Sequence, residues 1–227
     1  MHPIADICIM HILIVAATRQ EIEQTINWLE DSFNNIPQHS VNILFTGVGL
    51  LSSSYNLSSS IFHHKPDFIL QAGIAGSFSN KYPPGIVVVA GSEIVGDCGV
   101  MEDQRFIDIF DLGLADANVI PFVEKKLVNH HLMNWNKLAL PIVNGVTVNE
   151  ITTDPKRITI LKEKYEADIE TMEGASLHFI ALQQKIPFIQ VRAISNFAGD
   201  RNKKNWKIKE ALTVLNNSLI TFIQEIR

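Results

Sequence analysis

Cysteine is scarce in this chain, with only Cys8 and Cys98 among 227 residues. Two cysteines provide no disulfide framework, no CxxC motif and no zinc-binding spacing. We expect both to be small buried side chains in a reducing compartment, which indicates a cytoplasmic protein. None of the eight histidines falls at the end of a predicted strand. We therefore treat the histidines as surface residues and assign no metal site.

Excess positive charge is also lacking, because 19 Lys and Arg stand against 24 Asp and Glu, a net charge of -5. This balance argues against a nucleic-acid-binding surface. The densest basic run, 201–209, follows Asp200 and is interpreted as a solvated loop and the start of a helix. The apolar N-terminal stretch has no basic n-region and no small-residue cleavage site, and its second half is typical of a core strand. We expect neither a signal peptide nor a membrane span.

Short apolar runs alternate with segments of helical periodicity along the whole chain. This alternation predicts a single α/β domain, residues 1–227, with a largely parallel sheet covered by helices on both faces. Asp154 is a candidate N-cap followed by a proline at the first helical position. The expected strands lie within 11–17, 41–49, 67–78, 85–96, 140–150 and 187–196, and the expected helices within 19–31, 50–62, 153–165, 170–185 and 205–226.

Ligands of such sheets bind at the carboxyl ends of the strands. Two turns that follow predicted strands, 46–49 and 73–77, lie there, and so do Glu21 and Asn196. Small residues in the second turn let backbone N–H groups approach a ligand, although a plain tight turn explains them equally well. The turn is neither a dinucleotide fingerprint nor a P-loop, so we expect no cofactor. Its candidate ligand-binding residues are Gly73, Ile74, Ala75 and Gly76.

Three polar side chains have both a structural and a chemical interpretation. Glu21, at a helix start, either favours the helix dipole or carries a reactive carboxylate. Glu173 follows Met172 and precedes an apolar helix face, so it either caps that helix or accepts two hydrogen bonds from a sugar diol. Asn196 either turns the chain at a strand end or matches the N7 and O6 edge of a purine, because an amide both donates and accepts.

Four motifs in the same order resemble the nucleoside phosphorylase and nucleosidase superfamily. HILIVAATRQEI is similar to the first strand and glutamate helix of methylthioadenosine/S-adenosylhomocysteine nucleosidases, and QAGIAGSF to the superfamily's glycine-rich turn. ETMEGASL resembles its Met-Glu ribose motif, and VRAISN its base-recognition strand. The resemblance implies a nucleoside phosphorylase-like fold, a three-layer α/β/α sandwich around a central mixed, largely parallel sheet.

The resemblance implies a role for each matching residue. Glu21 falls where the nucleosidases have the glutamate that activates water, and Glu173 with Met172 falls at the ribose site. Asn196 replaces the aspartate with which adenine-specific nucleosidases help to protonate the departing base. An amide is no acid, but it can donate a hydrogen bond to the carbonyl of a 6-oxopurine. We therefore expect hypoxanthine as the leaving base, with Glu21 and Asn196 as the catalytic residues.

The resemblance also favours water as the nucleophile. The hexameric bacterial phosphorylases place a phosphate-binding arginine before the glycine-rich turn, where this chain has Gln71 or Ala72. No replacement arginine is evident in the sequence, with Arg19 left as a candidate.

Three further stretches, SEIVGDCGVMED, GVTVNEITTD and SNFAGDRNKKNW, resemble the futalosine hydrolases. These enzymes of menaquinone biosynthesis release hypoxanthine from futalosine. The resemblance implies that Arg201 or a residue near Asp97 contacts the aromatic arm at the 5′ side of the substrate. Val148 and Arg201 are the further residues expected to bind the substrate.

Other functions remain open from the sequence. A purine nucleoside phosphorylase would require phosphate, a methylthioadenosine/S-adenosylhomocysteine-type nucleosidase would release adenine, and a catalytically silent nucleoside-binding domain would bind without turnover. In each case the partner is a small purine nucleoside, with no nucleic acid and no membrane. The superfamily resemblance implies a homodimer or higher homo-oligomer, for which the apolar segment 106–114 offers a candidate interface.

Overall fold

A computed structural model describes residues 10–31 and 39–226, in which strands and helices alternate as the hydrophobic pattern predicts. Asp154 caps a helix as expected, because its side chain accepts a hydrogen bond from the backbone N–H of Lys156. The elements are β1 (His11–Ala16), α1 (Arg19–Asp31), β2 (Ser40–Phe45), α2 (Leu50–His63), β3 (Phe68–Ser77), β4 (Val87–Val95), β5 (Gly99–Glu102), β6 (Arg105–Asp108), β7 (Leu127–Val128), α3 (Leu132–Trp135), β8 (Ile142–Thr147), α4 (Pro155–Tyr165), β9 (Ile169–Thr171), α5 (Gly174–Gln184), β10 (Phe188–Phe197), a 3-10 turn (Lys203–Asn205) and α6 (Ile208–Glu225).

The main sheet is mixed and largely parallel, with the strand order β10-β4-β8-β9-β3-β1-β2 and β7 paired to β4. It differs from the sheet of a plain three-layer sandwich because β10 also pairs with β3, so that β3, β9, β8, β4 and β10 form a closed ring. The length of β3 explains this closure. Its first half pairs with β1, its last two residues pair with β9, and β10 runs along its other edge.

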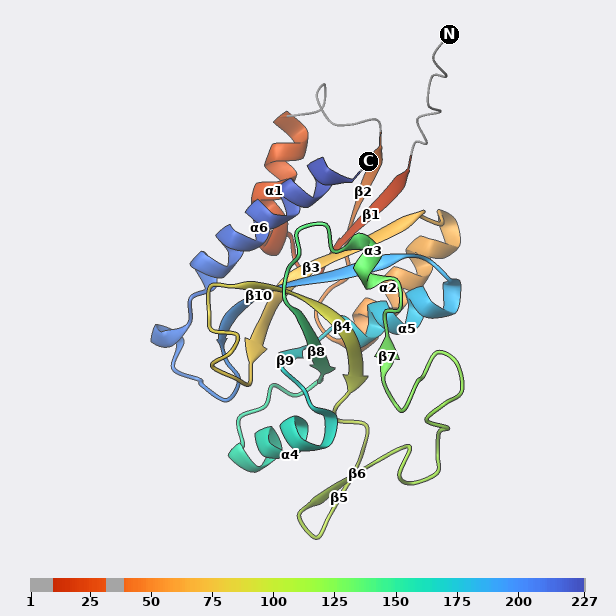
Figure 1. The fold of residues 1–227 in the computed structure, drawn as a ribbon, viewed down its shortest axis with the longest axis vertical. Coiled ribbons are helices and arrows are strands. Elements are labelled where there is room, and N and C mark those ends of the chain that lie inside the picture. The colour runs from red at the N-terminus through yellow and green to blue at the C-terminus, as the bar shows by residue number, and fades with distance from the viewer. Residues whose placement is uncertain (1–9, 32–38, 227) are drawn as a thin grey trace.

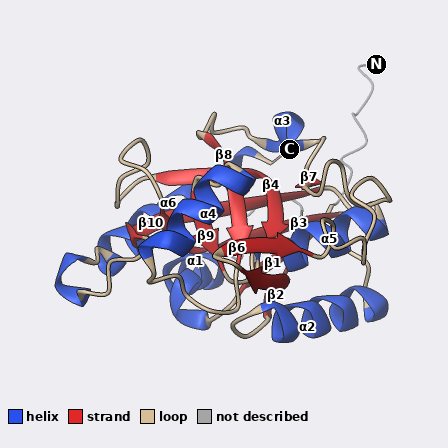
Figure 2. Cartoon of the chain, turned by 90° about the horizontal axis from the view of Figure 1, so that it is seen from below, coloured by secondary structure: helices blue, strands red, loops and turns tan. Residues whose placement is uncertain are grey.

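Helices cover both faces of the strands that extend from the ring. In Figure 1, α1 and α6 lie together on one side, and α2 and α5 lie together on the other. Figure 2 shows the same arrangement from below, with α2 running beneath the strands. The buried face of α1 is formed by Ile22, Ile26 and Leu29, the residues that its periodicity predicts. The closed ring has its own apolar filling, one side chain from each strand: Ala75, Val88, Val143, Ile169 and Ile194.

Two expectations about single residues are wrong. His178 is fully buried on α5 and is no surface residue, because its Nδ1 bonds the Leu127 carbonyl at 2.8 Å. Cys98 is exposed, since it lies outside the strand that precedes it, and Cys8 lies outside the described residues.

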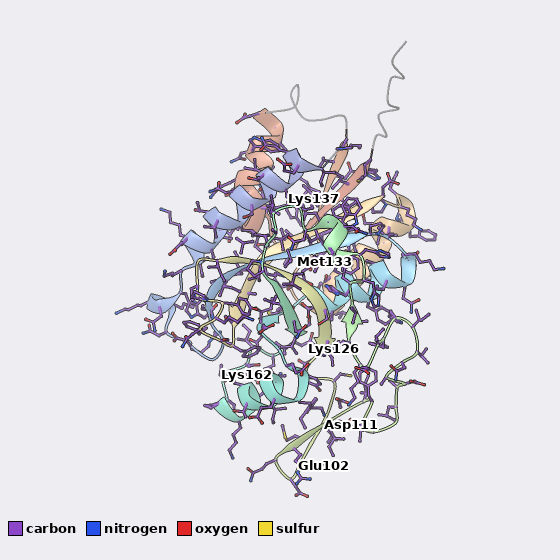
Figure 3. All side chains as sticks on the ribbon, viewed as in Figure 1. Glu102, Asp111, Lys126, Met133, Lys137 and Lys162 are labelled. Atoms are coloured by element: carbon purple, nitrogen blue, oxygen red, sulfur yellow. The ribbon has the colours of Figure 1, made fainter. Side chains whose placement is uncertain are left out.

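The segment between β4 and β8 has no apolar periodicity, and the sequence predicted no elements in it. It contains the hairpin of β5 and β6, which projects from the sheet, with Glu102 near its tip in Figure 3. Within the described ranges, no helix is long and apolar enough to cross a membrane.

Candidate active site

A cavity of about 380 Å³ opens where β1, β3 and β10 end. It brings together residues that lie far apart in the sequence, from the loop after β1 to α6. Among the predicted site residues, those that line it are Glu21, Ile74, Ala75, Gly76, Met172, Glu173, Asn196 and Arg201. The rule that ligands bind at the carboxyl ends of parallel strands therefore locates the cavity correctly.

A capping turn fixes the carboxylate of Glu21. Thr18 and Glu21 are spaced as in a capping box, and the backbone N–H of Thr18 donates to Glu21 Oε2 at 2.9 Å. The other oxygen, Oε1, lies 3.3 Å from the backbone N–H of Ile74 in β3. A non-helical residue, Ile22, separates this first turn from the rest of α1. The buried Asn216 anchors the turn by donating to the carbonyl of Glu21 at 2.9 Å.

Gly73 is required where Glu21 approaches the sheet. A Cβ atom at this position would lie 2.3 Å from Arg192 Nη1 and 2.8 Å from Glu21 Oε1. Both distances are too short for non-bonded atoms, so a side chain here would displace the carboxylate or the guanidinium. Gly73 therefore lies behind the two charged groups and is not part of the cavity wall.

Glu173 holds its carboxylate at the start of α5. The side chain is 6% exposed, and its Oε1 accepts a hydrogen bond from the backbone N–H of Gly49 at 3.0 Å. Its Oε2 lies 3.7 Å from Arg192 Nη1. Burial raises the pKa of Glu173, and the Glu21 charge acts in the same direction, whereas Arg192 and the Gly49 N–H oppose the rise. The predicted turn at 46–49 thus contributes a backbone donor to the site.

Arg192 is the residue that the sequence reasoning missed. It is 1% exposed on β10, and its Nη2 donates to Gln71 Oε1 at 2.9 Å. An arginine therefore does reach the position before the glycine-rich turn, although it comes from another strand. The available signal was a charged residue inside the apolar strand sequence 187–196, where a charge is almost never buried without a partner.

The amide of Asn196 has a fixed orientation. Its Nδ2 donates to the carbonyl of Phe197 at 2.9 Å, and its Oδ1 accepts from the Ser195 hydroxyl at 2.7 Å. Because a backbone carbonyl can only accept, the amide nitrogen must be the atom that faces Phe197. One N–H and one lone pair of this amide are then left for a ligand.

Of two further predicted substrate-binding residues, one lies away from the cavity and the other lies at its exposed edge. Val148 is fully buried and packs with Leu161 and Tyr165 of α4, away from the cavity. Arg201 is exposed at the cavity, with its guanidinium carbon 5.3 Å from the centre of the Trp206 ring. The described residues contain no group of three or more His, Cys, Asp or Glu side chains that would hold a metal ion.

Known proteins resemble this chain over most of its length. Futalosine hydrolase of Streptomyces coelicolor is 29% identical over 154 residues, which cover 67% of this chain and 63% of that protein, slightly under two thirds of it. A 5'-methylthioadenosine/S-adenosylhomocysteine nucleosidase of Bacillus velezensis is 24% identical over 237 residues, covering 93% of this chain and 96% of that protein.

Among solved structures, futalosine hydrolase of Helicobacter pylori superposes with a TM-score of 0.77 at 16% identity. The superposition covers 96% of this chain and 99% of that one, so the two share a fold. A family profile described as the phosphorylase superfamily matches residues 12–225, nearly the entire chain. The chain belongs to the phosphorylase superfamily.

Proposed function

We propose that this protein is a nucleoside hydrolase that cleaves the N-glycosidic bond of futalosine and releases hypoxanthine and dehypoxanthine futalosine. The observation that carries the proposal is one cavity whose lining includes the carboxylates of Glu21 and Glu173 and the amide of Asn196. The similarity to curated futalosine hydrolases supports the same substrate and a place in menaquinone biosynthesis.

In the proposed reaction, one carboxylate activates the attacking water and the other binds the ribose. Glu21 acts as general base and takes a proton from a water molecule whose oxygen forms a bond to C1′. The bond between C1′ and N9 breaks through an oxocarbenium-like state, and the electron pair leaves with the base. Glu173 accepts hydrogen bonds from the 2′ and 3′ hydroxyls, with Met172 beside it, and its charge stabilises the positive ring. Backbone groups of 74–76, which line the cavity, help to place the water.

Asn196 then stabilises the departing base. Its free N–H donates to N7 or O6 of hypoxanthine, so that negative charge on the base meets a donor already held in place by Ser195 and Phe197. The base acquires its proton from solvent water. Adenine presents an amino group instead of O6, which leaves the free N–H of the half-buried Asn196 amide without an acceptor at that position.

Water is favoured over phosphate by the charge around the cavity. Glu21 and Glu173 both face the place of attack, and one arginine, Arg192, lies between them within the described part of the chain. A phosphate dianion would be repelled by the two carboxylates, whereas neutral water would not. Because Arg192 lies beside Gln71, this chain does not lack an arginine at the position before the glycine-rich turn, and the preference for water rests on Glu21.

The proposed enzyme acts as one domain of residues 1–227, in the cytoplasm and as a homo-oligomer. The residues that line the cavity extend from Ala17 to Leu212, so nearly the whole chain is needed to form the cavity, which supports a single domain. The exposed thiol of Cys98 suits a reducing compartment. Apolar side chains on α2, including Leu51 and Phe62 at 86% and 88% exposure, support a face covered by a second copy.

The test is a chromatographic assay of purified protein with futalosine, methylthioadenosine and inosine, each with and without phosphate. We expect free hypoxanthine from futalosine at a rate that does not depend on phosphate. Adenine from methylthioadenosine as the dominant product would overturn the substrate assignment, and phosphate-dependent cleavage of inosine would make the protein a phosphorylase. Nucleoside binding without turnover would leave a binding protein.

A further inference from the structure

Four carboxylates line the cavity, and two of them, Asp200 and Glu170, have no part in the proposed reaction. Glu170 is the more deeply buried of these two. It is 8% exposed, and its Oε1 lies 3.3 Å from the backbone N–H of Thr152. The other oxygen, Oε2, is buried and has no hydrogen-bond partner within the described residues. Burial raises the pKa of Glu170, against the opposing effects of Thr152 and the Arg157 charge. The Thr152 hydroxyl beside it is also buried without a partner and helps to lower the pKa of Glu170, so it is a protein donor for this carboxylate. An ionised carboxylate accepts up to about four hydrogen bonds, and Glu170 therefore has acceptor capacity left for a ligand in the cavity that it lines.

Strand register places Glu170 and Asn196 on either side of one glycine. Gly76 of β3 pairs with Glu170 of β9 along one edge and with Asn196 of β10 along the other. An irregularity at Ser195 interrupts the alternation of β10 just before Asn196, so the shared side of the carboxylate and the amide follows from the cavity that both line, across a glycine with no side chain. All three residues line the cavity. Two strand spacings, about 10 Å, separate the outer backbones and leave room for a purine between the side-chain ends.

The hydrogen-bonding pattern of a 6-oxopurine is complementary to this pair. Its O6 and N7 are acceptors and suit the free N–H of Asn196, whereas its N1 carries a hydrogen and suits a carboxylate. Adenine has a lone pair at N1, which would face the charge of Glu170. We propose that Glu170 is a specificity-determining residue that accepts the N1–H of the 6-oxopurine base. This inference rests on the proposed function and identifies a second base-reading residue for it.

The decisive variant is Glu170→Gln, assayed on a 6-oxopurine nucleoside, futalosine, and on its 6-amino analogue. Glutamine keeps an oxygen for the Thr152 N–H but turns an NH₂ group toward N1. We expect kcat/KM on futalosine to fall by about ten- to a hundredfold, and kcat/KM on the 6-amino analogue to rise. Glu150→Gln is the matched control, because its side chain is 82% exposed and its substitution removes the same charge near Thr152. The control should leave the ratio of the two values unchanged.

A purely structural role for Glu170 would lower both activities together and leave their ratio as in the wild type, which would overturn the inference. Wild-type enzyme with an N1-methylated hypoxanthine nucleoside gives a second measurement that does not depend on the variant folding. Undiminished cleavage of that substrate would also overturn the inference. Failure of the wild type to cleave either nucleoside would overturn the proposed function and this inference with it.

Discussion

At the scale of single residues, the site depends on a few charged groups whose positions are fixed by local turns. Glu21 is held by Thr18 and approaches the sheet over Gly73, which has no side chain. Arg192 is held by Gln71 and lies near Glu173. Each charge is thus positioned by a neighbour in the structure before any ligand arrives, which reduces the reorganisation that the reaction requires.

Replacing Glu21 by glutamine tests the general base. The amide keeps the size of the side chain but cannot take a proton, so kcat should fall by about 100-fold or more while KM changes little. Glu23→Gln is the control, because Glu23 lies on the same helix and is 57% exposed beside Arg19. Kinetics on futalosine with both variants measure the effect. Full kcat in Glu21→Gln would remove Glu21 from its proposed role.

At the scale of elements, the hairpin of β5 and β6 is held by a charged cluster at its base. Asp108, at the end of β6, is 2% exposed and bonds Lys125, Lys164 and the Tyr165 hydroxyl. Burial acts to raise the pKa of Asp108, but the Asp111 N–H and the two lysines outweigh it and hold the pKa below its usual value. Asp111, close to the same lysines and labelled in Figure 3, has a pKa lowered to about 2.

The charge of Asp108 should therefore stabilise the fold. Because its pKa is lower in the folded state, its contribution is present above the unfolded pKa of 3.8 and is lost as the pH falls through the folded value. We expect Asp108→Asn to lower the free energy of unfolding by about 2 kcal/mol at neutral pH, since the two lysines lose the buried one of their two carboxylate partners and keep Asp111. Urea unfolding measures the change. Glu102→Gln on the same hairpin should have almost no effect, and an equal loss in both would contradict the prediction.

At the scale of the whole molecule, a buried carboxylate joins the ring of strands to α5. Glu93 of β4 is fully buried and accepts hydrogen bonds from Thr147, Thr171 and Gln190, which lie on β8, β9 and β10. The Thr147 oxygen in turn accepts the backbone N–H of Ala175 in the first turn of α5, at 2.8 Å. This network therefore supports the start of the helix that Glu173 precedes.

The free energy of unfolding should depend on pH through the ionisation of Glu93. Burial raises its pKa from 4.5 to about 6, against the opposing hydrogen bonds of Gln190, Thr147 and Thr171 and the Arg192 charge. The folded state then binds the extra proton, so the contribution is full below 4.5 and is lost as the pH rises through 6, a change of about 2 kcal/mol. Glu93→Gln should remove this slope from the free energy of unfolding, measured with urea between these pH values. The same slope in the variant would contradict the prediction.

The sequence by itself determined the alternation of strands and helices and the strand ends at which the cavity opens. Hydrophobic periodicity is local, so the face of α1 and the cap at Asp154 could be predicted from neighbouring residues. Glu21 and Asn196 could be assigned to one site because parallel strands bring their carboxyl ends together.

Only the tertiary structure decided how distant strands pair. The contact of Arg192 with Gln71 joins residues 121 positions apart, and the row of Glu170, Gly76 and Asn196 depends on the register of three strands. The closure of the sheet through β10 and β3 has the same origin. No local pattern encodes such a register, because it results from the packing of the whole core. The contacts of Arg192 with Gln71 and Glu173, and the position of Glu170 across Gly76 from Asn196, were therefore visible only in the folded chain.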